Sequence, residues 1–103
     1  MFVGSYIKKM RRGGWVSFPK AWLAMLGDDR AVFILPDPSG GKSLVIVPAK
    51  DIRREQVKSA MFVNIREDGR MRIPFGLVAY LGFKDVVCFS GNIRTVSLSV
   101  SCC

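Results

Sequence analysis

The segment GRMRIPFGLVAYLG at residues 69–82 repeats the pattern of GWVSFPKAWLAMLG at residues 14–27. The opening glycines, the prolines and the closing Leu-Gly pairs all keep one offset, 69 − 14 = 55 residues, without a gap. Each segment predicts a glycine turn, a short strand, a helix that begins at proline and a stop at glycine. A repeat of this length is typical of a duplicated supersecondary unit.

The strand in the second segment has a clear alternation of apolar and polar residues. Met71 and Ile73 are predicted to face the core, while Arg70 and Arg72 face outward together. Apolar runs bounded by turn-forming residues predict further strands on both sides of the repeated segments. The expected strands are Phe2–Met10, Trp15–Phe18, Ala31–Leu35, Ser43–Val47, Met61–Ile65, Arg70–Ile73, Asp85–Ser90 and Thr95–Val100.

These elements predict one domain over residues 1–103, mostly β with short helices. Repeat one spans residues 1–48, a connecting segment with a short surface helix spans 49–59, and repeat two spans 60–101. No linker is long enough to separate two domains, so both repeats are expected to share one core. A chain of 103 residues buries a modest part of its surface, so association with a second copy would help to hide its apolar residues.

The charge of the chain favours a polyanionic partner. The net charge is +8, and residues 1–27 hold five cations and no acidic residue: Lys8, Lys9, Arg11, Arg12 and Lys20. Nucleic acid is the first candidate for such a block, and an acidic protein or a membrane surface is the second. A merely solvated basic face is the remaining alternative.

Several other classes of function find no support in the sequence. There is no histidine, and Cys88, Cys102 and Cys103 match neither a disulfide framework nor a zinc motif. We therefore expect reduced thiols, no metal, no cofactor and no enzymatic activity. The apolar runs are too short to cross a bilayer, and the N-terminus does not resemble a signal peptide.

The order of strand, glycine turn, strand, proline, short helix and hairpin resembles the swapped-hairpin unit of the AbrB family. Two such units in tandem, opening with Met1-Phe2-x-Gly4, resemble the MraZ family. Gly69–Pro74 matches the family's turn and strand better than Gly14–Pro19 does. The resemblance covers nearly the whole chain, but Arg11 and Arg66 stand where the family has a turn aspartate, and Trp15 stands where it has an arginine.

The resemblance implies a double-split β-barrel built from two tandem repeats. It further implies a cytoplasmic, nucleoid-associated transcription regulator that acts as a homo-oligomer and binds double-stranded DNA through paired basic turns. No small-molecule substrate and no membrane are expected. A protein with the same fold that serves only as a protein-interaction or assembly module, such as an antitoxin-like unit or a diverged paralogue, is the alternative.

The candidate DNA-binding residues are the cations of the two turns and of the first helix: Lys8, Lys9, Arg11, Arg12, Lys20, Arg66, Arg70 and Arg72. The first turn suits phosphate contacts, and the shared face of Arg70 and Arg72 suits phosphates or a base edge. Pairing of these two arginines with Glu67 or Asp68 is the alternative. Trp15 is expected to pack against the other repeat, with stacking on a base or sugar as the second interpretation.

Overall fold

The computed structural model describes residues 2–38, 43–81, 86–91 and 96–99. The chain is mostly β with short helices, as expected. The elements are β1 (Ser5–Lys9), β2 (Trp15–Ser17), α1 (Lys20–Leu23), η1 (Ala24–Leu26), β3 (Ala31–Pro36), β4 (Ser43–Pro48), η2 (Ala49–Asp51), α2 (Arg54–Val57), β5 (Met61–Asn64), β6 (Arg70–Arg72), α3 (Phe75–Leu81), β7 (Val86–Gly91) and β8 (Val96–Ser99), where η marks a 3-10 helix. The expected connecting helix is thus a 3-10 turn followed by one short helix.

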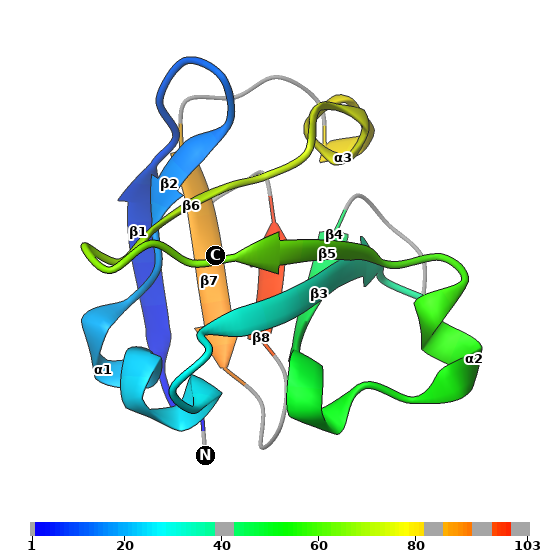
Figure 1. Ribbon diagram of the computed structural model, residues 1–103. Helices are drawn as coiled ribbons and strands as arrows, with labels where there is room; N and C mark the ends of the chain where they lie inside the picture. The colour runs from blue at the N-terminus through cyan, green and yellow to red at the C-terminus, as the bar shows by residue number, and fades with distance from the viewer. Residues whose placement is uncertain (1, 39–42, 82–85, 92–95, 100–103) are drawn as a thin grey trace.

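The described strands form an antiparallel six-stranded sheet and a two-stranded ribbon. The order in the large sheet is β1-β7-β8-β4-β3-β5, and β2 pairs with β6 in the ribbon. Figure 1 shows β3 and β5 crossing in front of β7 and β8, so the large sheet curls around the core. Among the described residues β1 and β5 are its two edges and do not pair with each other, so no closed barrel is formed.

The strand pairing follows the offset found in the sequence. Ile7 pairs with Cys88 across β1 and β7, and Phe62 pairs with Phe33 across β5 and β3. These two pairs are related by the same shift, since 62 − 7 = 55 and 88 − 33 = 55. Each outer strand therefore pairs with a strand of the opposite half, and the hairpin of β7 and β8 lies beside the hairpin of β3 and β4 between the two outer strands.

The core lies between the two arms of the curled sheet. Val32 and Ile34 of β3, Leu44 of β4, and Val87 and Phe89 of β7 are all fully buried. Burial of such side chains contributes about 1.5–3 kcal/mol each, before the loss of conformational entropy. One continuous apolar cluster therefore joins strands from both halves of the chain.

Trp22 of α1 is a core residue, as expected, with 2% of its surface exposed. Its ring meets Phe2, Tyr6 and Phe18 edge to face at centroid distances of 5.7, 5.0 and 6.1 Å. Its indole N–H donates a 3.2 Å hydrogen bond to the carbonyl of Val3. A buried indole needs such an acceptor, so α1 is fixed against the strand that leads into the first basic turn.

One expectation about the cysteines is wrong. Cys88 is fully buried in β7 and is disulfide-bonded, whereas reduced thiols were expected. Cysteine spacing along a chain does not reveal which sulfurs meet in the fold, so the sequence could not supply this pairing. Cys102 and Cys103 lie outside the described residues, as do the expected helix stop at Gly82 and the ends of the final hairpin.

Candidate nucleic-acid interface

The β2·β6 ribbon separates its inward from its outward side chains. Val16 and Met71 lie directly opposite each other and are buried, with 2% and 0% exposure. Opposite residues of an antiparallel pair share a face, so the neighbouring pairs face outward, as expected for both arginines. These outward pairs are Trp15 with Arg72 and Ser17 with Arg70.

The two basic turns are fixed to opposite ends of this ribbon by matching hydrogen bonds. The N–H of Ile73 donates to the carbonyl of Gly14, and the N–H of Phe18 donates to the carbonyl of Gly69, both at 2.9 Å. The two bonds are related by the same offset, since 73 − 18 = 55 and 69 − 14 = 55. Each turn is thus held by the strand of the other repeat.

Glycine is required where the first turn meets the ribbon. Gly14 has a φ of 85°, and a Cβ atom there would lie 2.7 Å from the carbonyl oxygen of Ile73. A side chain would therefore meet both the left-handed backbone and the opposite strand. This explains why the sequence pattern of the turn ends in glycine.

Cations from both turns meet around Trp15. A hollow of about 30 Å³ in the ribbon's outer face is lined by residues of both repeats: Lys9, Arg11, Trp15, Val16, Ser17 and Arg70. The guanidinium carbon of Arg66 lies 5.7 Å from the centre of the Trp15 ring, within the range of cation–π attraction. Trp15 therefore contacts the other repeat, as expected, and the fold gathers cations that lie more than 50 residues apart.

Arg70 does not lie free on this face. Its Nε donates a 2.9 Å hydrogen bond to Asp68 Oδ2, and its backbone N–H donates to Asp68 Oδ1 at 3.1 Å. The backbone N–H of Arg70 is the main cause of the lowered pKa of Asp68; desolvation opposes this lowering, and the Arg70 guanidinium adds to it. The ion pair that the sequence offered as an alternative is therefore the observed state of Arg70.

Arg72 is held differently and contacts no acid in any described hydrogen bond or ion pair. Its Nε donates a 3.0 Å hydrogen bond to the carbonyl of Gly13 in the first turn. This bond uses one N–H donor of the guanidinium, and the other N–H groups remain able to donate to a ligand. Arg72 therefore has a set direction and remaining donors on the outward face.

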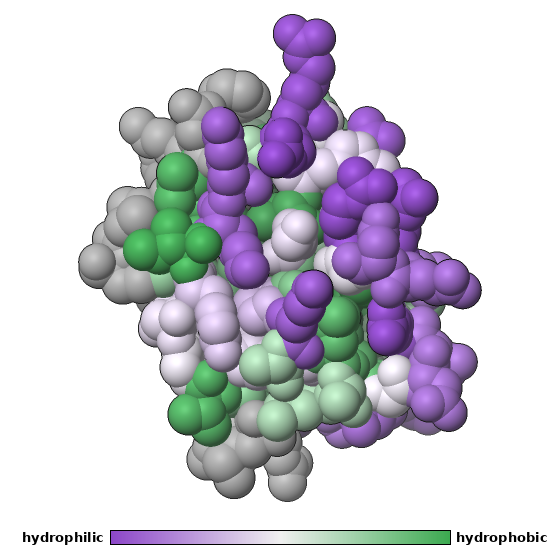
Figure 2. Space-filling model, turned by 90° about the vertical axis from the view of Figure 1, so that its left-hand side faces the viewer, coloured by the Kyte–Doolittle hydropathy of each residue, from purple (hydrophilic) through white to green (hydrophobic). Residues whose placement is uncertain are grey.

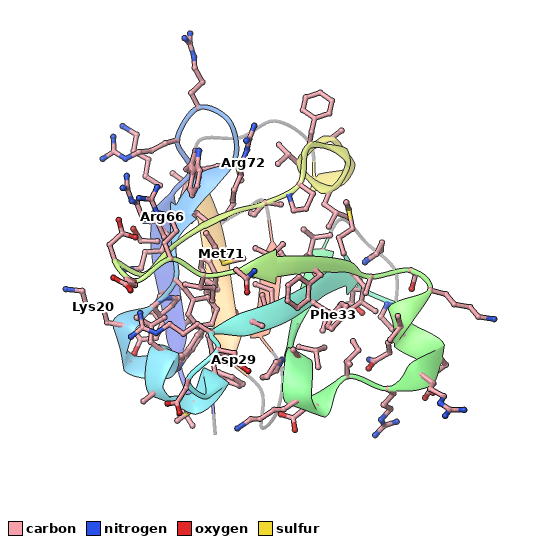
Figure 3. The ribbon with its side chains drawn as sticks, in the orientation of Figure 1. Lys20, Asp29, Phe33, Arg66, Met71 and Arg72 are labelled. Carbon is pink, nitrogen blue, oxygen red and sulfur yellow. The ribbon has the colours of Figure 1, made fainter. Side chains whose placement is uncertain are left out.

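The remaining candidate residues lie less centrally. Lys8 is half-buried and Lys9 exposed because successive residues of β1 face opposite sides. Arg12 is exposed in the first turn. Figure 3 shows Lys20 extending from α1 away from the body of the protein, below Arg66. The structure thus brings Lys9, Arg11, Arg66, Arg70 and Arg72 to the ribbon, and leaves Lys8, Arg12 and Lys20 around its margins.

Sequence reasoning missed Arg30, which was treated as part of a polar link. Its guanidinium donates a 2.8 Å hydrogen bond to the carbonyl of Glu67 and a longer one, 3.5 Å, to the carbonyl of Arg66. No short motif marks such a contact, because the partners lie more than 35 residues away in the sequence.

The surface around the turns is polar on one side and apolar on the other. Figure 2 views the side of the molecule that carries β1 and shows hydrophilic side chains gathered toward its top and right.

Within the described residues no group of three or more His, Cys, Asp or Glu side chains could hold a metal ion, and no helix is long and apolar enough to cross a bilayer. Neither a protein-family model nor a curated protein matches this chain.

Proposed function

We propose that the chain is a DNA-binding transcriptional regulator of the MraZ/AbrB type, with two tandem repeats arranged as a double-split β-barrel. It acts as a homo-oligomer in the cytoplasm, on the nucleoid, and contacts duplex DNA with its basic turns. It uses no cofactor and catalyses no reaction. A disulfide such as that of Cys88 is rare in cytoplasmic proteins, so the proposed location rests on the family resemblance.

One observation carries this proposal: the ribbon collects cations of both repeats on one outward face. Lys9, Arg11 and Arg70 line one hollow beside Trp15, and Arg66 lies over the Trp15 ring. Clustered cations attract phosphates because each contact releases condensed counterions. An aromatic ring among them suits stacking on a sugar or base.

The two turns are proposed to contribute in different ways. Arg11 and Arg12 lie in an exposed turn with no acidic residue beside them in the sequence, which suits attraction to any phosphate. Arg70 and Arg72 are each directed by a hydrogen bond, and a fixed direction is what base reading requires. Arg11→Ala with Arg12→Ala should weaken binding to all duplexes alike, whereas Arg72→Ala should cost about 1–3 kcal/mol on a preferred sequence and little on random DNA.

Titration of the protein with duplex DNA at several salt concentrations tests the proposal. If about 4–6 phosphates are neutralised, log K should fall with log salt at a slope of about −4 to −5. The preferred sequence is obtained by selection from random duplexes, and a scrambled duplex serves as the control. Absence of binding at low salt, or binding that does not depend on salt, would overturn the DNA-binding proposal.

A second candidate is a protein-interaction module, and exposed apolar side chains favour it. Phe75 of α3 is 85% exposed, and Val3 and Ile7 near β1 are 65% and 62% exposed. Large exposed apolar groups mark contact surfaces when they gather. This function would leave oligomerisation intact and show no salt-sensitive affinity for DNA, so the same titration separates the two candidates.

A further inference from the structure

Arg30 is tied to the second basic turn at two points. Its backbone carbonyl accepts a 2.9 Å hydrogen bond from the N–H of Ile65, which continues the β3·β5 ladder up to the start of the turn. Its side chain then reaches the carbonyls of Arg66 and Glu67 within the turn. Arg30 therefore connects the end of the sheet, through its backbone, with the turn, through its guanidinium.

The backbone of Arg30 is unusual for its residue type. Its φ is 47°, and among the described residues other than glycine it alone has a positive φ. The left-handed region is unfavourable for a side chain as large as arginine. A hydrogen-bonded guanidinium that fixes a functional segment is a physical reason for arginine to occupy such a position.

We propose that Arg30 is a positioning residue that holds the second basic turn, so that Arg66 lies over Trp15 and Arg70 lies on the ribbon. Arg30 acts through the turn's carbonyls and does not itself contact DNA. The turn is also supported by three backbone bonds of 2.9 Å, from the N–H of Gly69 to the carbonyl of Arg66, from Arg66 to Arg70 and from Phe18 to Gly69, and by the carboxylate of Asp68. Arg30 binds the side of the turn that these leave free, the carbonyl of Glu67.

The first turn lacks a counterpart of this contact in the sequence. The residue 55 positions after Arg30 is Asp85, which lies outside the described residues. An ionised carboxylate has no donor for a carbonyl oxygen. We call the hydrogen bonds from the Arg30 side chain to the carbonyls of Arg66 and Glu67 the clamp. The sequence assigns this clamp to the second turn alone, which fits a directed role for that turn and a general phosphate-binding role for the first.

Amide hydrogen exchange in the absence of DNA tests the clamp directly. Arg30→Gly removes the guanidinium and suits the positive φ, so the sheet should stay folded. Loss of the clamp should speed exchange of the Gly69 amide by about tenfold or more, through local opening of the turn. The Gly14 amide, which closes the first turn at the matching position with a 3.1 Å bond to the Arg11 carbonyl, should exchange at its wild-type rate.

Two further variants serve as controls. Arg30→Lys keeps a cation that can donate to the same carbonyls and should restore part of the protection. Arg54→Ala removes the same charge from α2, on the side of the molecule away from the turn in Figure 1, and should change neither amide. Unchanged exchange at Gly69 in Arg30→Gly, or equal acceleration at Gly69 and Gly14, would overturn the proposal.

The role of Arg30 in recognition rests on the proposed DNA-binding function and is tested by a separate binding measurement. Arg30→Gly should lower the affinity for a preferred duplex about tenfold. On a scrambled duplex, Arg30→Gly should lower the affinity no more than Arg54→Ala does. Equal losses on both duplexes would show that Arg30 contributes only charge, and would overturn its role in recognition. If the wild-type protein binds no duplex, the proposed function fails, while hydrogen exchange still decides whether Arg30 holds the turn.

Discussion

Asp68 competes with any phosphate that approaches Arg70. The carboxylate accepts hydrogen bonds from both the backbone and the side chain of Arg70, and both side chains are about half exposed, at 45% and 48%. An exposed ion pair of this kind adds little to the stability of the fold. In the proposed DNA-binding function its main effect is on binding, because it sets the direction of Arg70 while placing a negative charge beside it.

We expect Asp68→Asn to bind DNA more tightly than the wild type, by about threefold to tenfold at low salt, because a repulsive charge is removed. The amide oxygen can still accept from the N–H of Arg70, so thermal melting should change little. Asp51→Asn, which removes an acid from η2, is the matched control. A similar gain in both variants would show that net charge alone matters.

The pKa of Asp68 lies below the ordinary value of an aspartate, chiefly because the N–H of Arg70 stabilises the carboxylate. A lowered folded-state pKa means that the stabilising contact is present above the unfolded-state pKa and is lost as the pH falls through the folded-state pKa. The contact should therefore be intact between pH 5 and 8 and weaken only in more acidic solution.

Titration of the Asp68 carboxyl carbon by NMR measures this pKa. In Arg70→Ala the pKa should rise only part of the way to the ordinary value, because the backbone N–H remains. An unchanged pKa in that variant would mean that the Arg70 guanidinium does not hold Asp68 in solution.

At the scale of elements, the ribbon depends on the glycine that joins it to the first turn. Gly14→Ala combines a φ of 85° with a Cβ atom 2.7 Å from the Ile73 carbonyl oxygen, and should destabilise the fold by about 2–4 kcal/mol. Gly69→Ala, at the matching position of the second turn, has a similar φ, 87°, but its Cβ atom would meet only the flexible Leu23 side chain, at 3.4 Å, so this substitution should cost about 1–2 kcal/mol. Urea unfolding of both variants measures the difference. Equal losses in the free energy of unfolding would mean that the backbone at the end of the ribbon moves easily to make room for the Cβ atom.

The sequence predicted the elements better than it predicted their contacts. Glycine, proline and the alternation around Met71 are local signals, so strands, helix starts and the outward face of Arg70 and Arg72 could all be read from them. The clamp made by Arg30 could not, because it depends on a left-handed backbone and on carbonyls that only the folded sheet brings near. The choice between DNA contact and ion pairing at Arg70 also needed coordinates, since both use the same neighbouring residues.

At the scale of the whole molecule, the described sheet is open and its edges carry exposed apolar groups. Ile7 of β1 and Phe62 of β5 stand at matching positions of the two edge strands, 55 residues apart, and are 62% and 54% exposed. Edge strands with exposed apolar side chains are prone to pair with other chains. The apolar surface and the unpaired edges together favour association of several copies.

Sedimentation equilibrium at micromolar concentration should therefore show an oligomer. Substitution of the 85% exposed Phe75 by serine together with Ile7→Ser should shift the distribution toward monomer. Val57→Ser, at a 45% exposed position of α2, is a control of similar chemistry. A wild-type protein that sediments as a monomer would remove the basis for the oligomeric part of the proposal.

The pairing of β1 with β7 also determines when the sheet can form during translation. Residues 5–9 leave the ribosome well before their partner, which begins at residue 86, so 86 − 9 − 1 = 76 residues lie between the two strands. At about 5–20 residues per second, the first strand waits roughly 4–15 s for its partner to be made. During that interval the nascent chain carries an incomplete sheet, and the sheet can be completed only after β7 has been made. Slow translation of the second half should therefore lower the yield of folded protein more than slow translation of the first.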